Sequence, residues 1–142
     1  MPSSLLKDAS RADLYHLPAP RRLDLLEMVN QANFLLLTAD VGACHGIGEV
    51  LVDFGKALHF PPWYGTNLDA LHDCLSDPDW HPERGVVILI SGLEALRRRD
   101  PENFPRLLDV LAAACRSRSA GQPPLWVLST TPARGLASLP EA

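Results

Sequence analysis

Apolar residues along this chain follow two different periods, which together predict alternating strands and helices. Three short and mostly apolar runs, at 34–38, 86–90 and 125–129, have the length of buried strands. The run at 86–90 contains only valine, isoleucine and leucine, which is typical of a central strand in a parallel sheet. Because helical patterns separate the runs, the sequence predicts an α/β fold with a three-stranded parallel sheet packed with helices.

Helical spacing is clearest in three segments, and residues 92–98 are expected to add one or two turns. The first segment ends before Pro61, the second begins after Asn67, and Gly121 stops the third. The apolar positions of the first are Ile47, Val50, Leu51, Phe54 and Leu58. Those of the third are Phe104, Leu107, Leu108, Leu111 and Ala114 or Cys115.

The same pattern divides the chain into three parts. Residues 1–32 are expected to form an N-terminal helical extension, in which Pro18 and Pro20 separate a weak helix from a better one. Leu23, Leu26 and Val29 give that second helix its spacing. Residues 33–130 form the main domain, and residues 131–142 are expected to be a C-terminal tail.

Composition adds that this is an ordinary globular chain. The 142 residues suffice for one domain with a substantial core, and no apolar run approaches the length of a membrane span. The first ten residues lack the apolar stretch of a secretory signal, which predicts a cytoplasmic protein. Cys44, Cys74 and Cys115 are an odd number without paired spacing, which indicates reduced thiols.

Charge is distributed unevenly. From Asp40 to Glu83 there are eight acidic residues and one basic residue, a net charge of −7, whereas the rest of the chain carries +3. A focused acidic region attracts basic partners and repels nucleic acid. We therefore expect a protein partner, with no direct binding of RNA or DNA and no membrane contact.

The segment from 60 to 77 is the most informative part of the acidic region. Its prolines and Gly65 break the chain, and Asn67 can cap a new helix whose buried face holds Leu68, Leu71 and Leu75. Three acids lie at i, i+4 and i+8 along another face, without a basic residue among them: Asp69, Asp73 and Asp77. Each like-charge pair costs a few tenths of a kcal/mol, roughly. Such an unfavourable stripe indicates a surface that meets a basic partner.

This segment also carries a family resemblance. The pattern Phe60-Pro61-x-Trp63-Tyr64-Gly65-x-Asn67-Leu68-Asp69-Ala70-Leu71-x-Asp73-Cys74-Leu75 resembles the signature of the barstar-type bacterial ribonuclease inhibitors. The order of elements agrees with that family over roughly residues 33–130. The resemblance implies a barstar-like fold with a three-stranded parallel sheet, and an intracellular inhibitor that binds a small basic ribonuclease stoichiometrically. It implies no enzymatic activity and no cofactor, and we expect a monomer when the partner is absent.

The resemblance also implies a set of contact residues. In that family an acidic helix and the loop before it block the nuclease active site, and a carboxylate takes the place of an RNA phosphate. By motif position, Asp73 is that carboxylate. The residues expected to bind the partner are Trp63, Tyr64, Asp69, His72, Asp73, Ser76, Asp77 and Trp80. Two positions depart from the family: His72 replaces a tryptophan, and Arg116 replaces an acidic contact.

Structural roles compete with these assignments. Asp69 favours a helix N-terminus, Asp77 can start a turn with Pro78, and one of the two aromatic residues Trp63 and Tyr64 is expected in the core. Cys74 shares the buried side of the helix and is expected to act as a small core residue.

Three other functions were weighed against inhibition of a ribonuclease. An acid–base enzyme could be built on Asp69, His72 and Asp73, but the sequence has no nucleophile elbow or phosphate loop, and the acidic stripe is expected to be convex rather than a pocket. A metal site around Cys44 and His45 lacks CxxC or HxxxH spacing, so no metal is expected. An interaction or immunity module of the same fold, whose partner is a non-ribonuclease toxin, remains the alternative.

Overall fold

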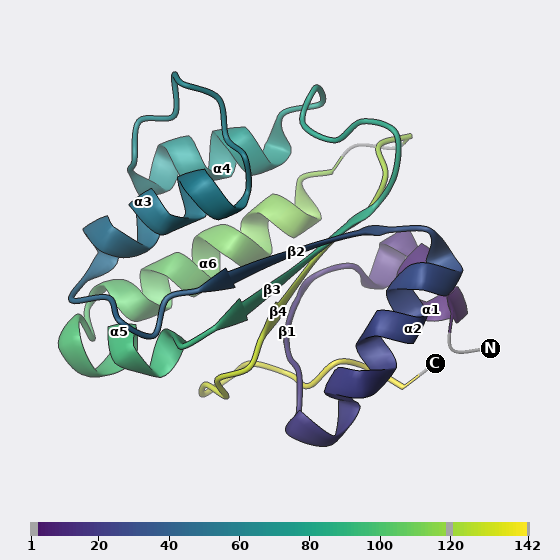
Figure 1. Ribbon diagram of the computed structural model, residues 1–142, viewed down its shortest axis with the longest axis horizontal. Coiled ribbons are helices and arrows are strands. Elements are labelled where there is room, and N and C mark those ends of the chain that lie inside the picture. Colours follow the sequence, from purple (N-terminus) through teal and green to yellow (C-terminus); the bar gives the residue numbers. More distant parts are fainter. Residues whose placement is uncertain (1–2, 119–120, 142) are drawn as a thin grey trace.

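The computed structural model describes residues 3–118 and 121–141 and consists of a parallel sheet between two layers of helices (Figure 1). Two short 3-10 helices, Ala9–Arg11 and Ala19–Arg21, flank the first strand. The strands are β1 (Leu14–His16), β2 (Leu35–Asp40), β3 (Val86–Ser91) and β4 (Leu125–Ser129). The helices are α1 (Ser3–Lys7), α2 (Arg22–Ala32), α3 (Ile47–Ala57), α4 (Leu68–Ser76), α5 (Leu93–Arg99) and α6 (Asn103–Arg116).

The sheet has four parallel strands in the order β1-β4-β3-β2, so the expectation of three strands is wrong. The fourth is β1, in which Leu14 pairs with Val127 and His16 with Ser129. Strand β1 has only three residues and ends in His16, so it shows neither an apolar run nor an alternating pattern. For this reason the sequence predicts only helices in residues 1–32. The other three strands lie where the apolar runs predicted them.

Helices cover both faces of the sheet (Figure 1). On one face α3, α4, α5 and α6 enclose the larger core, into which Val86, Ile88 and Ile90 of β3 point. On the other face α1 and α2 enclose a second core, which receives Val87 and the fully buried Trp126. Because β3 and β4 are buried on both sides, they need apolar residues at every position, which explains their uninterrupted hydrophobic runs.

Helix α2 lies where the sequence predicted a helix, but it buries a different face. Its buried residues are Leu25, Met28, Val29 and Ala32. Leu23 and Leu26, on which the expected spacing rested, are 85% and 55% exposed. Both choices have helical spacing, and only packing against the sheet decides between them.

Residues 137–139 lie beside His16 of β1. The Leu139 side chain is buried, and its backbone N–H donates to the His16 carbonyl at 2.9 Å. The Arg21 guanidinium donates to the carbonyl oxygens of Leu139 and Pro140. Trp126 ties β4 to the N-terminal segment, since its indole N–H donates to the Leu6 carbonyl at 3.0 Å.

The division of the chain into an N-terminal extension, a main domain and a C-terminal tail stays a prediction. No helix in the described part of the chain is long and apolar enough to cross a membrane.

Candidate protein-binding surface

Helix α4 forms as the sequence predicted. The Asn67 side-chain oxygen accepts a hydrogen bond from the Ala70 backbone N–H at 2.7 Å, which satisfies one of the free N–H groups of the first turn. Leu71 and Leu75 are buried in the larger core, Cys74 is also buried, and Leu68 is half-buried. The prediction that Cys74 is a small core residue is confirmed.

The acids of α4 project from its other side. Asp69 and Asp73 are exposed, and within the described part of the chain no hydrogen bond or ion pair engages either carboxylate. Asp69 lies in the first turn, where the helix dipole favours a negative charge. Asp73 has no such favourable position, so the fold gains nothing evident from its carboxylate.

Asp77 differs from these two. It is the C-cap residue, and its Oδ1 accepts a hydrogen bond from the Asp79 backbone N–H at 2.9 Å. This is the turn geometry that a side chain of Asp commonly stabilises. Its carboxylate therefore has a local structural role, whatever further contact it makes.

The C-terminal end of α4 is fastened to α6 and to the segment after it. The Arg118 guanidinium donates to the Leu75 carbonyl at 3.2 Å, which places a positive charge at the negative end of the helix dipole. The hydroxyl groups of Ser76 and Ser117 lie 3.0 Å apart and share a hydrogen bond. Ser76 is half-buried, so part of its surface still faces solvent.

The loop before α4 presents one aromatic residue and buries part of the other. Trp63 is 60% exposed. Tyr64 is half-buried, its hydroxyl donates to the Leu51 carbonyl at 2.9 Å, and burial raises the pKa of its phenol to about 12. Gly55 makes this packing possible, since a Cβ there would lie 3.0 Å from the Tyr64 ring. The expectation that one of the two residues is a core aromatic is therefore confirmed, and it is Tyr64 that packs on the core.

Trp80 lies beneath this loop rather than on the surface. It is 8% exposed, and its indole N–H donates to the Leu58 carbonyl at 3.0 Å. Its ring lies 5.7 Å from that of Phe60, which in turn lies 4.9 Å from the ring of Tyr64. The three rings pack against one another and on the larger core, so that Trp80 offers a partner little surface of its own.

His72 is half-buried on α4, between Asp69 and Asp73 in sequence. Within the described residues no hydrogen bond or ion pair joins it to Asp69, the contact that an acid–base pair would need. The same part of the chain holds no group of three His, Cys, Asp or Glu side chains that could bind a metal ion.

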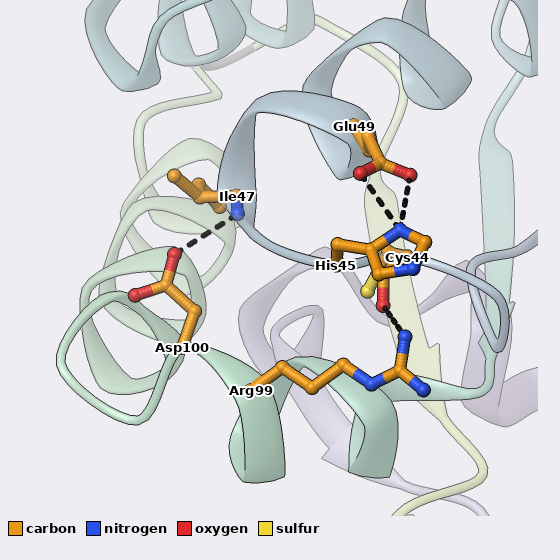
Figure 2. A network of polar contacts seen from close by, with 6 residues as sticks. All are labelled: Cys44, His45, Ile47, Glu49, Arg99 and Asp100. Carbon is orange, nitrogen blue, oxygen red and sulfur yellow. Dashed lines mark hydrogen bonds and ion pairs between the residues drawn. The ribbon is translucent and has the colours of Figure 1, made fainter.

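The N-terminus of α3 is held by residues that the sequence did not indicate (Figure 2). Asp100, at the end of α5, accepts a hydrogen bond from the Ile47 backbone N–H at 3.0 Å and from the Asn103 side chain. These hydrogen bonds lower the pKa of the Asp100 carboxyl below its usual value, and the bond from Ile47 contributes most, before that from Asn103. Arg99 donates to the Cys44 carbonyl at 3.2 Å. The residue that caps α3 lies 53 residues away in the sequence, so no local capping motif could predict it.

A comparison with known families assigns the chain independently of its structure. The family model described as Barstar (barnase inhibitor) matches residues 34–130, which are 97 of the 142 residues. The chain therefore belongs to the barstar family. Members of that family are protein inhibitors rather than enzymes, and their description names a ribonuclease as the partner. A comparison with individually curated proteins found no match.

Proposed function

We propose that this chain is a protein inhibitor that binds a small basic ribonuclease one to one and blocks its active site. The observation that carries the proposal is the exposed pair Asp69 and Asp73 on a firmly held helix, in a chain of the barstar family. The carboxylates have no partner among the described residues, and their like charges at i and i+4 repel each other. A basic active site supplies the missing partner.

Asp73 is the residue proposed to take the place of an RNA phosphate. A ribonuclease active site gathers Arg, Lys and His, and a carboxylate accepts charge-assisted hydrogen bonds from all three. Asp69, one turn earlier, adds a second negative charge beside it. The exposed ring of Trp63 offers apolar contact at the edge of this charged centre.

Rigidity supports the proposal. Helix α4 is capped by Asn67, fastened at its other end by Arg118 and supported by the rings beneath the loop. Little conformational entropy is then lost when the surface binds, which leaves more of the interaction energy for affinity. The net charge of −7 over residues 40–83 would also accelerate encounter with a basic enzyme.

The remaining residues expected to contact the partner have different roles in this proposal. His72 and Ser76 are half-buried and lie beside the acids, where they can contact the enzyme directly. Tyr64, Asp77 and Trp80 already make hydrogen bonds within the chain, so that their main contribution is to hold the surface in place.

Affinity capture tests the proposal. Wild-type protein and the Asp73→Ala variant serve as paired baits in a lysate of the source cells, and captured proteins are identified and assayed for ribonuclease activity. A small basic ribonuclease held by the wild type and lost by the variant is the expected result. Equal capture by both baits would remove Asp73 from the site.

One observation favours a second candidate, an immunity module for a toxin that is not a ribonuclease. Arg116 stands where the family has an acidic contact, and its guanidinium pairs with Asp13 at 3.0 Å. A cation that is paired within the chain, at a position where the family has an acidic contact, suits a different partner. Capture of a basic protein without ribonuclease activity, lost on Asp73→Ala, would establish this function instead.

A further inference from the structure

A groove lies next to the acidic surface, between the start of α3 and the start of α4. Its volume is about 360 Å³, large enough for at least one whole side chain. The walls are mostly apolar and are lined by Ile47, Gly48, Leu51, Thr66, Asn67, Leu68 and Asp69. Asp69 belongs to both the groove and the acid pair, so the two form one continuous surface. The packing of the fold does not fill this groove.

Gly48 on the wall of the groove has no structural reason to be glycine. Its φ lies outside the left-handed range, and a Cβ built on it would meet no atom within 4 Å. Gly48 is the second residue of α3, and glycine is a poorer helix former than alanine. Its missing side chain leaves this wall of the groove bare, so that a side chain of another molecule has room to enter.

Thr66 gives an independent indication at the opposite wall. Its φ is 49°, in the left-handed region, which a β-branched residue rarely adopts. Backbone strain of this kind is often found at binding and active sites, and Thr66 is the β-branched member of the four non-glycine residues with a positive φ in the described chain. Val52 is 43% exposed and lies one turn after Gly48 on α3, which extends the apolar surface beyond the groove.

We infer that this groove takes an apolar side chain of the same ribonuclease whose active site receives Asp73. The inference rests on the proposed function and adds a second contact to it. The apolar walls select an aliphatic or aromatic side chain, and Asp69 at the rim selects a neighbouring Lys or Arg. A basic enzyme with an apolar residue beside its charged cleft therefore fits the whole surface, and that residue sets specificity among related ribonucleases.

Filling the groove from its own wall tests the inference. Gly48→Trp places a large side chain where a Cβ has open space, and Gly48→Ala is the matched control. Both variants should fold, with a thermal midpoint equal to or above that of the wild type. Dissociation constants are measured with the ribonuclease that the wild type inhibits most tightly in a panel of small basic ribonucleases, beginning with barnase.

We expect Gly48→Trp to weaken binding at least about tenfold and Gly48→Ala to stay within about twofold of the wild type. Unchanged binding by Gly48→Trp, together with loss of binding by Asp73→Ala, would overturn the groove and leave the inhibitor function intact. A wild-type chain that inhibits no ribonuclease of the panel would overturn both. A wild-type dimer that Gly48→Trp converts to a monomer would assign the groove to self-association and contradict the inference.

Discussion

The two exposed acids of α4, Asp69 and Asp73, and the three acids between Glu94 and Glu102 behave differently. In the second region Glu94 accepts a hydrogen bond from the Thr131 hydroxyl, Asp100 caps α3, and Glu102 pairs with Arg106 at 3.6 Å. In α4, Asp69 and Asp73 engage no group of the described chain. Both regions lie on the same face of the sheet, so their surroundings do not explain the difference.

We interpret the difference as one between carboxylates that stabilise the fold and carboxylates that are available to a partner. A fold that could place Glu94, Asp100 and Glu102 against donors could equally well have neutralised two exposed positions of a nine-residue helix. The unpaired acids of α4 are therefore interpreted as half of an interface, which a basic partner completes.

The largest expected effect comes from removing the central carboxylate. Asp73→Ala should weaken binding of the ribonuclease by at least about 2 kcal/mol, because the cations it meets are left without a partner. The free energy of unfolding should change by less than about 0.5 kcal/mol. Isothermal titration calorimetry and urea unfolding measure the two quantities.

Asp109 on α6 provides the matched control for that experiment. It is also exposed, and no hydrogen bond or ion pair engages its carboxylate within the described part of the chain, yet it lies on a different helix from the proposed surface. Asp109→Ala should leave binding within about 0.5 kcal/mol of the wild type. An equal loss from both substitutions would mean that net charge, rather than α4, determines affinity.

The opposite pattern is expected for an acid of the second region. Asp100→Ala should lower the thermal midpoint by about 4 °C, because α3 loses its cap, while the folded protein keeps its affinity for the ribonuclease. Thermal unfolding followed by circular dichroism measures the midpoint. A normal midpoint with impaired binding would reverse the roles given to the two regions.

Asp100 also makes a prediction about pH. Since folding lowers the pKa of its carboxyl, its stabilising effect is present above the ordinary pKa, near about 4, and is lost as the pH falls through the folded value. Asp100→Asn keeps an oxygen acceptor but cannot ionise. Its stability should therefore fall less steeply than that of the wild type below about pH 4, and parallel curves for the two proteins would contradict this role.

The smallest effect is expected from charge at the edge of the acidic region. Asp79→Asn removes an exposed charge and should lower the association rate by less than about threefold, with little change in the dissociation rate. The association rate of the wild type should fall as salt is raised, since ions screen exposed charges. Stopped-flow measurements at several salt concentrations determine these rates, and an association rate independent of salt would rule out electrostatic steering.

The sequence predicted the parts of the fold that depend on local patterns. The strands β2, β3 and β4, the helix α3 and the Asn67 cap all follow from apolar spacing or from a capping residue near the helix they start. Strand β1 and the buried face of α2 did not follow, because three residues carry no period and leucines stand at helical spacing on an exposed face of α2 as well.

The candidate surface divides in the same way. The acid pair was predictable, since like charges at helical spacing are visible in sequence. The inward positions of Tyr64 and Trp80 depend on partners more than ten residues away, namely Leu51 and Leu58. The groove was missed although Gly48 gave a signal, a glycine inside an amphipathic helix. Only the open space around it, known from the structure, gives that glycine a meaning.

A stoichiometric inhibition assay tests the central claim most directly. A small basic ribonuclease at a concentration well above the dissociation constant is titrated with the wild-type chain, and cleavage of a fluorogenic RNA is followed. The proposed function predicts a linear loss of activity that ends at one inhibitor per enzyme. Full activity at a severalfold excess of inhibitor, across a panel of such ribonucleases that includes barnase, would contradict it.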